Sequence, residues 1–420
     1  MTTIDIKYGR SSLAFDYDAD LFQTISGPHE QLALTDVEIG NALDHPIDSK
    51  RIEDIVSPGD TVLIVVPDAT RETAAGQIVN LVIRRLIANG TAPGDISIVF
   101  ATGIHRPVTE AEKQQILTPF IAQRIKTINH DARDLASLVR IGETSGGIPA
   151  EVNRALVEHD HVILVGGVSF HYFAGFTGGR KLVCPGLAAA RTVSATHKLA
   201  FDCDTLSRRE GVDTGVLDGN AVHEAFVEAV SFVNPVFAIS TIVNDHGEAV
   251  EVYCGDWRSS HRAAADAYAS SHTAFISEKR DLVVASCGGS PHDINMIQAH
   301  KTIDAAARAC NDGGTLVILA ECADGLGRDD FLRWFDANDS RDLATRLCAK
   351  YKVNGQTAWN LLRLAEAFNI CIVTDLPDDI TTKMRLKKTS LDDAAQMIKA
   401  ARMSGFILPD GAKMNIKVTT

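Results

Sequence analysis

The sequence predicts an α/β protein of two domains, each with a mainly parallel β-sheet flanked by helices. Uninterrupted runs of Val, Ile and Leu recur along the chain, and such runs are typical of strands buried on both faces. In the N-terminal half each run leads into a polar loop and then a helical pattern, which is the order that parallel strands require. The length of 420 residues also suits two domains.

The N-terminal half is expected to open with two short alternating strands, at residues 3–8 and 12–16. Three strand–loop–helix units follow, with strands at 61–66, 95–101 and 161–168 and helices at 73–89, from Thr109 onward and at 187–199. The remaining elements expected here are a helix at 150–157, a polar loop at 200–220, a helix at 220–230, a hairpin at 236–253 and a long helix at 259–277.

The C-terminal half repeats the α/β pattern. Strands are expected at 281–286, 315–320, 369–374 and 412–418, and helices at 295–311, through most of 330–364 and at 391–403. We therefore divide the chain into an N-terminal domain, 1–275, a C-terminal domain, 276–410, and a final strand, 411–420. Whether that strand returns to the N-terminal domain is left open.

Composition excludes several classes of protein. A net charge of −13 argues against nucleic acid or an anionic membrane as a main partner, although a small anionic substrate remains compatible with it. The chain has no signal-like leader and no apolar run of membrane-spanning length, so a cytoplasmic location is expected. None of the eight cysteines forms a Cys-x-x-Cys motif, and we expect them to be reduced and mostly buried.

Polar residues follow each of the three buried N-terminal strands. Asp68 and Arg71 follow the first, His105 follows the second, and His171 and Lys181 follow the third. The carboxyl ends of parallel strands meet at one edge of a sheet, where ligands of open α/β sheets bind. The sequence therefore predicts a site at this edge.

The third loop, HYFAGFTGGRK, is the densest in chemistry. Lys181 lies in a Gly-rich turn, where a lysine can contact phosphate, form a Schiff base or carry a covalent cofactor. The Gly-x4-Gly-Lys-[Ser/Thr] pattern of a P-loop is absent. His197 lies on the helix that follows. The residues alone leave these alternatives open.

The order and spacing of His171, Lys181 and His197 resemble the nickel-dependent lactate racemase family. The resemblance implies that Lys181 is attached, through a thioamide, to a nickel-pincer nucleotide, Ni(II)-pyridinium-3,5-bisthiocarboxylate mononucleotide. It implies that His197 ligates the nickel, to which imidazole is suited. It also implies that the N-terminal domain binds the cofactor and that the active site lies in the cleft between the domains.

Racemisation moves hydrogen between the two faces of one carbon. One mechanism removes the hydroxyl proton while hydride leaves Cα for the cofactor, and the planar 2-keto acid then takes hydride back on its other face. Each face needs its own base, and histidine works near neutral pH. We expect His105 and His171 to be this acid/base pair. The alternative for His105 is that it caps a turn.

The resemblance assigns further residues by motif. Asp-Ala-Thr-Arg resembles the Asp-x-Thr-Arg of the family, so Arg71 is expected to hold the substrate carboxylate in a two-point contact. Trp359 resembles the tryptophan of the family's cleft, and a core tryptophan is the alternative. Contacts with the cofactor are expected from Asp68, Thr70, Gly178 and Gly179. Contacts with the substrate are expected from Gln298 and Lys301.

One position departs from the pattern. Lactate racemase has an aromatic residue immediately before the glutamine that Gln298 resembles, whereas this chain has Ile297. The departure suggests a substrate larger than lactate, such as a bulkier 2-hydroxy acid or a sugar acid.

The implied function is a racemase or epimerase of a small anionic 2-hydroxy acid, with cofactor biosynthesis proteins as partners. One alternative takes His105, His171 and His197 as a three-His zinc site of a hydrolase or lyase. Another is a non-catalytic paralogue that binds a nucleotide or a metal. The sequence does not indicate the oligomeric state.

Overall fold

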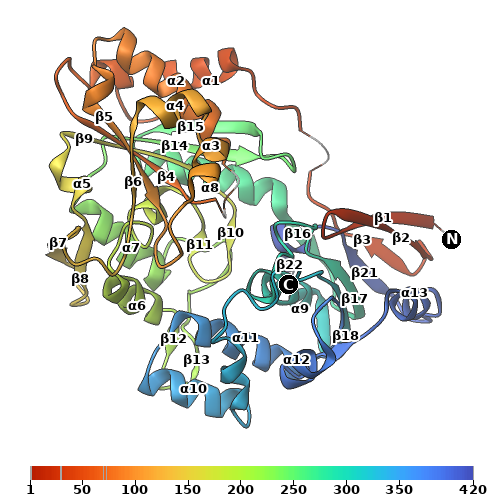
Figure 1. The fold of residues 1–420 in the computed structure, drawn as a ribbon. Helices are drawn as coiled ribbons and strands as arrows, with labels where there is room; N and C mark the ends of the chain where they lie inside the picture. The colour runs from red at the N-terminus through yellow and green to blue at the C-terminus, as the bar shows by residue number, and fades with distance from the viewer. Residues whose placement is uncertain (1, 29–30, 70, 72, 420) are drawn as a thin grey trace. The chain divides into compact units, whose positions relative to one another are not determined.

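The computed structural model describes residues 2–28, 31–69, 71 and 73–419 (Figure 1). The chain forms two compact units. Unit 1 comprises the described residues within Met1–Pro28, Phe201–Arg208 and Ser270–Thr420, and unit 2 comprises those within His29–Ala200 and Arg209–Ala269. No helix in this described part of the chain is both long and apolar enough to cross a membrane.

Unit 2 is built on a six-stranded sheet with the strand order β15-β14-β9-β4-β5-β6. All neighbouring strands are parallel except β14 and β15, which form the expected antiparallel hairpin. The strands of this sheet are β4 (Val62–Pro67), β5 (Ile96–Ala101), β6 (Lys126–Asn129), β9 (His161–Gly167), β14 (Phe237–Val243) and β15 (Ala249–Gly255). The helices of unit 2 are α1 (Asp36–Asp44), α2 (Ala75–Ala88), α3 (Glu110–Ile116), α4 (Pro119–Arg124), α5 (Ala155–Glu158), α6 (Ala190–Lys198), α7 (Ala221–Ser231) and most of α8 (Ser259–His272).

Strand β4 shows why its sequence is apolar throughout. Ile64 and Val66 pack with α1 and α2 in one core, whereas Leu63 and Val65 pack with α6 and α7 in another. Alternate side chains of a strand point to opposite faces, so a sheet covered on both sides needs apolar residues at every position. The predicted parallel α/β architecture of this half is therefore confirmed.

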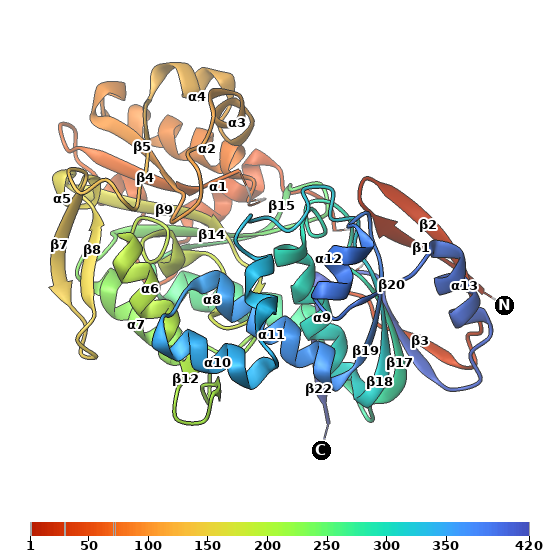
Figure 2. The same cartoon turned by 60° about the horizontal axis from the view of Figure 1, so that its bottom comes forward.

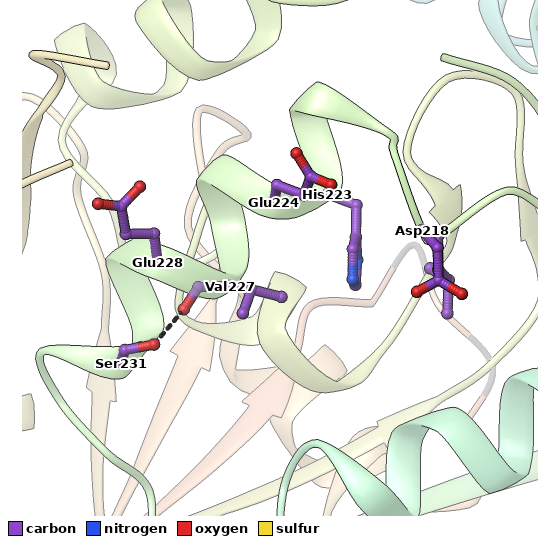
Figure 3. Close-up of a pocket in the computed structure, with 7 residues that line it drawn as sticks. Asp218, His223, Glu224, Val227, Glu228 and Ser231 are labelled. Carbon is purple, nitrogen blue, oxygen red and sulfur yellow. Dashed lines mark hydrogen bonds between the residues drawn. The ribbon is translucent and has the colours of Figure 1, made fainter. Parts of the chain in front are cut away.

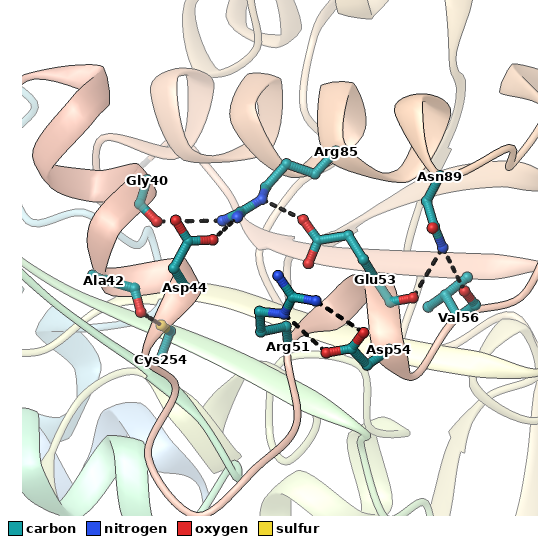
Figure 4. A network of polar contacts seen from close by, with 10 residues as sticks. All are labelled: Gly40, Ala42, Asp44, Arg51, Glu53, Asp54, Val56, Arg85, Asn89 and Cys254. Atoms are coloured by element: carbon teal, nitrogen blue, oxygen red, sulfur yellow. Dashed lines mark hydrogen bonds and ion pairs between the residues drawn. The ribbon is translucent and has the colours of Figure 1, made fainter.

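A polar network joins α1 to α2 at the edge of this unit (Figure 4). Arg85 on α2 pairs with both Asp44 and Glu53. Asn89 donates hydrogen bonds to the carbonyl oxygens of Glu53 and Val56, at 3.0 and 2.9 Å. These contacts hold the segment before β4 against the end of α2 without adding apolar area.

Unit 1 has a second six-stranded sheet, which is parallel throughout, with the order β20-β19-β18-β17-β21-β3. Its strands are β3 (Phe22–Thr24), β17 (Arg280–Ser286), β18 (Cys310–Leu319), β19 (Asn369–Val373), β20 (Lys387–Lys388) and β21 (Gly405–Leu408), and its helices are α9 (Met296–Ala309), α10 (Ser340–Ala349), α11 (Val353–Ala367), α12 (Asp378–Lys383) and α13 (Leu391–Lys399). Helices α9 and α11 cover one face, and α13 with the hairpin β1–β2 (Thr2–Tyr8, Ser11–Tyr17) covers the other (Figure 2).

The N-terminal segment belongs to unit 1, although we expected it in the same domain as residues up to 275. Strand β3 pairs with β21, and Ile6 and Phe15 pack on the face of β17 and β18. The final strand, β22 (Asn415–Val418), pairs in parallel with β16 (Thr273–Ile276), which also lies in unit 1. Pairing between distant segments decides both assignments.

The expected polar loop at 200–220 contains a short hairpin, β12 (Phe201–Asp202) and β13 (Ser207–Arg208), which belongs to unit 1. A disulfide between Cys203 and Cys348 ties this hairpin to α10. The expectation that all eight cysteines are reduced is therefore wrong for these two. The other six are free and buried, as predicted.

Two helix predictions are corrected by strand pairing. The segment expected as a helix at 150–157 is mostly β8 (Pro149–Asn153), which pairs with β7 (Leu138–Glu143), and only α5 is helical. Ala150 and Val152 alternate into the core, so tertiary packing overrides the helix-forming composition. The long helix expected at 259–277 ends at His272, where β16 begins.

Candidate active site

The three predicted loops do meet at one edge of the unit 2 sheet. Strands β9, β4 and β5 are consecutive neighbours, and all three are parallel. Asp68 directly follows β4, and His105 lies in the turn after β5. His171 ends β10 (Phe170–His171), which forms a two-residue hairpin with β11 (Gly175–Phe176) just after β9. The topology thus places these side chains at the carboxyl ends of adjacent strands.

His105 is oriented by Asp68. Its Nδ1 lies 2.7 Å from Oδ2 of Asp68, which is buried, whereas the side chain of His105 is 48% exposed. An ionised carboxylate accepts and does not donate, so Nδ1 of His105 carries the hydrogen. The neutral ring then presents the lone pair of Nε2, which is the form that a general base needs. Arg71 follows in the same turn, where its backbone N–H donates to the Asp68 carbonyl at 3.2 Å, while Thr70 lies outside the described residues.

His171 has the opposite arrangement. Its Nδ1 accepts a hydrogen bond from the backbone N–H of Ala174, at 3.2 Å. The ring stacks on Tyr172 and meets the ring of Phe173 edge to face, at a centroid distance of 4.5 Å. Because Nδ1 is the acceptor, the hydrogen of the neutral ring lies on Nε2; this tautomer follows from the hydrogen-bond pattern. The two histidines therefore present complementary ring nitrogens, a lone pair on His105 and an N–H on His171.

Lys181 and His197 lie beside the same two aromatic rings. Lys181 is in a short 3₁₀ turn, Gly179–Leu182, and its Nζ lies 5.9 Å from the ring centroids of both Phe173 and Phe226. His197, on α6, contacts the same rings at centroid distances of 5.2 and 5.6 Å. Burial, and next the charge of Lys181, lower the pKa of His197 to about 3.

His197 is therefore a neutral imidazole in an apolar pocket, only 6% exposed. A backbone hydrogen bond to Val193, one turn earlier on α6, acts on the ring and raises its pKa, but burial and Lys181 outweigh it. A neutral imidazole has two ring nitrogens, so one remains for a ligand or a metal. Burial also raises the pKa of the nearby Cys184 thiol to about 12, so this thiol is protonated in the metal-free protein.

The described residues contain no group of three His, Cys, Asp or Glu side chains close enough to hold a metal ion. His105, His171 and His197 are all described and form no such group. The three-His zinc alternative therefore has no support from the geometry.

The turn that carries Lys181 is fixed by close backbone contacts. Gly178 and Gly179 both have positive φ, at 72° and 49°. A Cβ at 178 would lie 2.7 Å from the carbonyl oxygen of Gly167, and one at 179 would lie 2.6 Å from the ring of His261. Both positions therefore require glycine for local reasons, and their contact with a nucleotide remains a prediction. The His105 loop joins the same turn, since Gly103 donates its N–H to Gly186 O at 2.8 Å.

The predicted substrate residues of the C-terminal half lie in unit 1. Gln298 and Lys301 share one face of α9, and Lys301 Nζ donates to Gln298 Oε1 at 2.6 Å. Trp359 is buried in α11 and meets Phe201 edge to face at 4.9 Å. Ile297 packs against the core of this unit. Their contacts with a substrate remain predictions.

A cavity of about 330 Å³ lies along α7 in unit 2 (Figure 3). It is lined by Leu217, Asp218, His223, Glu224, Val227, Glu228 and Ser231, none of which we predicted as a site residue. Its carboxylates already have partners: Asp218 pairs with Arg262, Glu224 accepts from Gly219, and Glu228 accepts from Ser145. Its histidine lies near the Lys181 turn, since the charge of Arg180 lowers the pKa of His223 after burial.

Comparison with known proteins identifies the family. A model of the lactate racemase N-terminal domain matches residues 8–207, and one of the lactate racemase C-terminal domain matches residues 276–416. The chain belongs to the lactate racemase family. It is therefore an isomerase, and the similarity covers both of its units.

Individual relatives agree. A lactate racemase from Thermoanaerobacterium thermosaccharolyticum is 27% identical over 425 residues, covering 99% of this chain and 97% of that protein. One from Lactiplantibacillus plantarum is 27% identical over 435 residues, covering 99% and 100%. The solved lactate racemase apoprotein from T. thermosaccharolyticum aligns with a TM-score of 0.90 at 27% identity, over 99% of this chain and 100% of that one. A Thermotoga maritima protein, at 18% identity and a TM-score of 0.70 over 93% and 100%, shows the fold alone.

Sequence reasoning missed four residues that shape the candidate site. Phe173 and Phe226 form the walls around Lys181 and His197, and Arg180 and His261 lie beneath the Lys181 turn. Phe173 and Arg180 were within the motif that we singled out. Phe226 and His261 lie on helices far along the chain, and nothing local in the sequence connects them with the motif.

Proposed function

We propose that this protein racemises or epimerises a 2-hydroxy acid with a nickel-pincer nucleotide attached to Lys181. The observation that carries the proposal is that Lys181 and His197 lie against the same two aromatic rings, Phe173 and Phe226. An amine for covalent attachment and a neutral imidazole for the metal thus lie within one apolar pocket. Membership of the lactate racemase family supports the same combination.

The residues fit the cofactor. Lys181 would anchor it, and His197 would supply a neutral nitrogen ligand to nickel, a metal for which imidazole is suited. When bound, the cofactor supplies an electrophile that can accept hydride from Cα of the substrate. The aromatic walls exclude water from this side of the pocket, which protects such chemistry from side reactions. The cofactor also implies partner proteins that synthesise it.

The acid/base work falls to the two histidines at the strand ends. Nε2 of His105, backed by Asp68, would take the hydroxyl proton of one enantiomer. Nε2–H of His171 would donate a hydrogen bond to the substrate oxygen. For the other enantiomer the roles exchange: the ring hydrogen of His171 moves from Nε2 to Nδ1, and Nε2 then takes the hydroxyl proton. Arg71 would hold the substrate carboxylate.

We propose a substrate larger than lactate. Ile297, adjacent to Gln298, is smaller than the aromatic residue expected in a lactate racemase, and it packs against the core of unit 1. The proposal keeps Gln298 and Lys301 as polar contacts to the substrate. A panel of 2-hydroxy acids that differ in side-chain length, including sugar acids, would give its order of preference.

The deciding experiment uses protein made in cells that synthesise the nickel-pincer cofactor. Intact mass, peptide mapping and metal analysis should find an adduct on Lys181 with one equivalent of nickel. A 2-hydroxy acid deuterated at Cα should then racemise with the deuterium retained, because hydride returns to the carbon from which it left. Lys181→Ala should lose both the adduct and the turnover.

Two outcomes would contradict the proposal. Turnover without nickel or an adduct would refute the cofactor. Loss of the Cα deuterium to solvent would refute hydride transfer in favour of proton abstraction. A loaded protein that binds 2-hydroxy acids without turnover would instead support the non-catalytic alternative.

A further inference from the structure

Arg180, immediately before Lys181, is among the largest fully buried side chains in the described part of the chain, at 1% exposure. No described carboxylate pairs with it. The charge that affects it is that of another cation, Arg262, and the pKa of Arg180 is lowered to about 9, first by burial and then by that charge. A buried guanidinium without an anion is expensive, so a specific set of hydrogen bonds must hold it.

Those hydrogen bonds go to the loop between His171 and Lys181. Nη2 donates to the carbonyl oxygen of Ala174 at 2.6 Å, and Nη1 lies 3.4 Å from the carbonyl oxygen of Thr177. The guanidinium therefore binds the loop at two points with the planar donor geometry that lysine lacks. The backbone carbonyl of Arg180 accepts from Cys184 at 3.0 Å, which fixes the other end of the turn.

Ala174 is the link between Arg180 and His171. Its carbonyl accepts from Arg180, and its N–H donates to Nδ1 of His171. These two groups belong to successive peptide planes that meet at the Cα of Ala174, so a fixed carbonyl restricts the direction of the N–H. The N–H of Phe173 also points to Nδ1 of His171, at 3.5 Å. Both bonds favour the ring form with its hydrogen on Nε2.

His261 supports the guanidinium from α8. Its Nε2 lies 2.9 Å from both Nη1 of Arg180 and the Thr177 carbonyl oxygen, so it bonds to one of these at a time. Burial, and next the charge of Arg180, keep the pKa of His261 well below its ordinary value, so the ring is neutral. It therefore supports the arginine without cancelling its charge.

We propose that Arg180 is a positioning residue for the reaction: by fixing Ala174, it holds His171 of the free enzyme in the Nε2–H tautomer and ties the His171 hairpin to the Lys181 turn. The catalytic consequence rests on the proposed function, whereas the effect on His171 does not. Arg180 acts on His171 through Ala174 and the shared loop.

The test is ¹⁵N NMR of the histidine rings in the cofactor-free full-length protein, with signals assigned from His105→Gln and His171→Gln. In the wild type His171 should show the Nε2–H pattern and His105 the Nδ1–H pattern. Arg180→Met, which keeps volume but loses all donors, should shift His171 to a tautomer mixture and leave His105 unchanged, because Asp68 holds His105 independently. Arg180→Lys should give a smaller shift, since an ammonium cannot span both carbonyls.

Arg262→Met is the matched control, because it removes a neighbouring cation without touching Ala174. It should leave the His171 signals in place. In the loaded enzyme, Arg180→Met should lower kcat about 10- to 100-fold with KM changed less than about twofold, as expected for misplaced catalytic groups.

An unchanged His171 signal in a folded Arg180→Met or Arg180→Lys protein would overturn the proposal. An equal shift in Arg262→Met would overturn it too, since the effect would then come from charge alone. If Arg180→Met fails to fold, Arg180→Lys decides. If the loaded wild-type protein lacks racemase activity but Arg180→Met still shifts the His171 signal, the positioning role is upheld and the proposed function is rejected.

Discussion

Each unit buries a charged side chain, and the two are satisfied in opposite ways. In unit 1, Asp304 accepts hydrogen bonds from Arg208, Arg308 and Asn360, at 3.1, 3.2 and 2.9 Å. Burial alone would raise the pKa of Asp304, but the two arginines and Asn360 outweigh it and hold that pKa below its ordinary value. In unit 2, Arg180 has carbonyl oxygens and a neutral histidine but no described carboxylate.

The difference separates a structural network from a functional one. The Asp304 network joins the β12–β13 hairpin to α9 and α11, and its opposite charges compensate each other. The Arg180 network leaves its charge uncompensated and lies directly below Lys181. Perturbed ionisable groups cluster at functional sites because catalysis needs them. The contrast therefore assigns stability to the first network and positioning to the second.

The largest stability effect should come from breaking the compensated network. Asp304→Ala leaves the partly buried Arg208 and Arg308 without their carboxylate, and the free energy of unfolding should fall by about 3–5 kcal/mol. Urea unfolding followed by circular dichroism measures this loss. Asp304→Asn, which keeps the shape and a carbonyl acceptor, should lose less. A loss below about 1 kcal/mol for Asp304→Ala would show that the network is not compensated as described.

The disulfide of unit 1 should have the next effect. Cys203→Ser opens the link between the β12–β13 hairpin and α10, and the free energy of unfolding should fall by about 2–4 kcal/mol. Dithiothreitol should lower the wild type to the level of the variant and leave the variant unchanged. Hydrogen exchange should increase in unit 1 around the hairpin. Equal wild-type stability with and without reductant would argue that the two thiols are not paired in solution.

Acid should weaken unit 2 more than unit 1. Burial is the first cause that lowers the pKa of His197 to about 3 and that of His261 well below normal, whereas in unit 1 His300 is lowered to about 4. Their unfolded-state pKa is about 6.5, so the unfolded chain binds more protons and stability is lost as pH falls from about 6.5 toward these values. Each histidine contributes at most about 1.4 kcal/mol per pH unit.

Hydrogen exchange at pH 7, 6 and 5 would test this. Amides of α6 and α8 should lose protection before those of α9. His197→Phe should make the protection of the α6 amides less dependent on pH, because the phenylalanine ring cannot be protonated. Simultaneous loss of protection in both units would show that they unfold together and would contradict the separation.

The smallest effect should come from an exposed pair. Arg346 and Asp342 lie four residues apart on α10, with oxygen and nitrogen 2.7 Å apart and both side chains partly exposed. Arg346→Ala should leave the free energy of unfolding almost unchanged, since solvent screens this pair. A loss as large as that of Asp304→Ala would remove the distinction between buried and exposed networks.

Sequence patterns predicted the elements in which each face is either fully covered or fully exposed. Strand β4 is apolar at every position because both faces are covered, and α2 shows a clear apolar stripe because one face is. Segment 150–157 misled us because its helix-forming residues pair as a strand with β7. The pairing of Cys203 with Cys348 joins residues 145 apart, a distance at which local spacing gives no information.

By itself the sequence determined the parallel α/β class, the strand-end loops and the motif of His171, Lys181 and His197. These follow from local rules, namely residue periodicity, turn chemistry and motif spacing. Only the tertiary structure decided the membership of the N-terminal segment in unit 1, the walls of Phe173 and Phe226, and the tautomers of His105 and His171. These depend on hydrogen bonds and packing between segments brought together by folding. Burial and the direction of each hydrogen bond decide the charge of a side chain and the position of its proton.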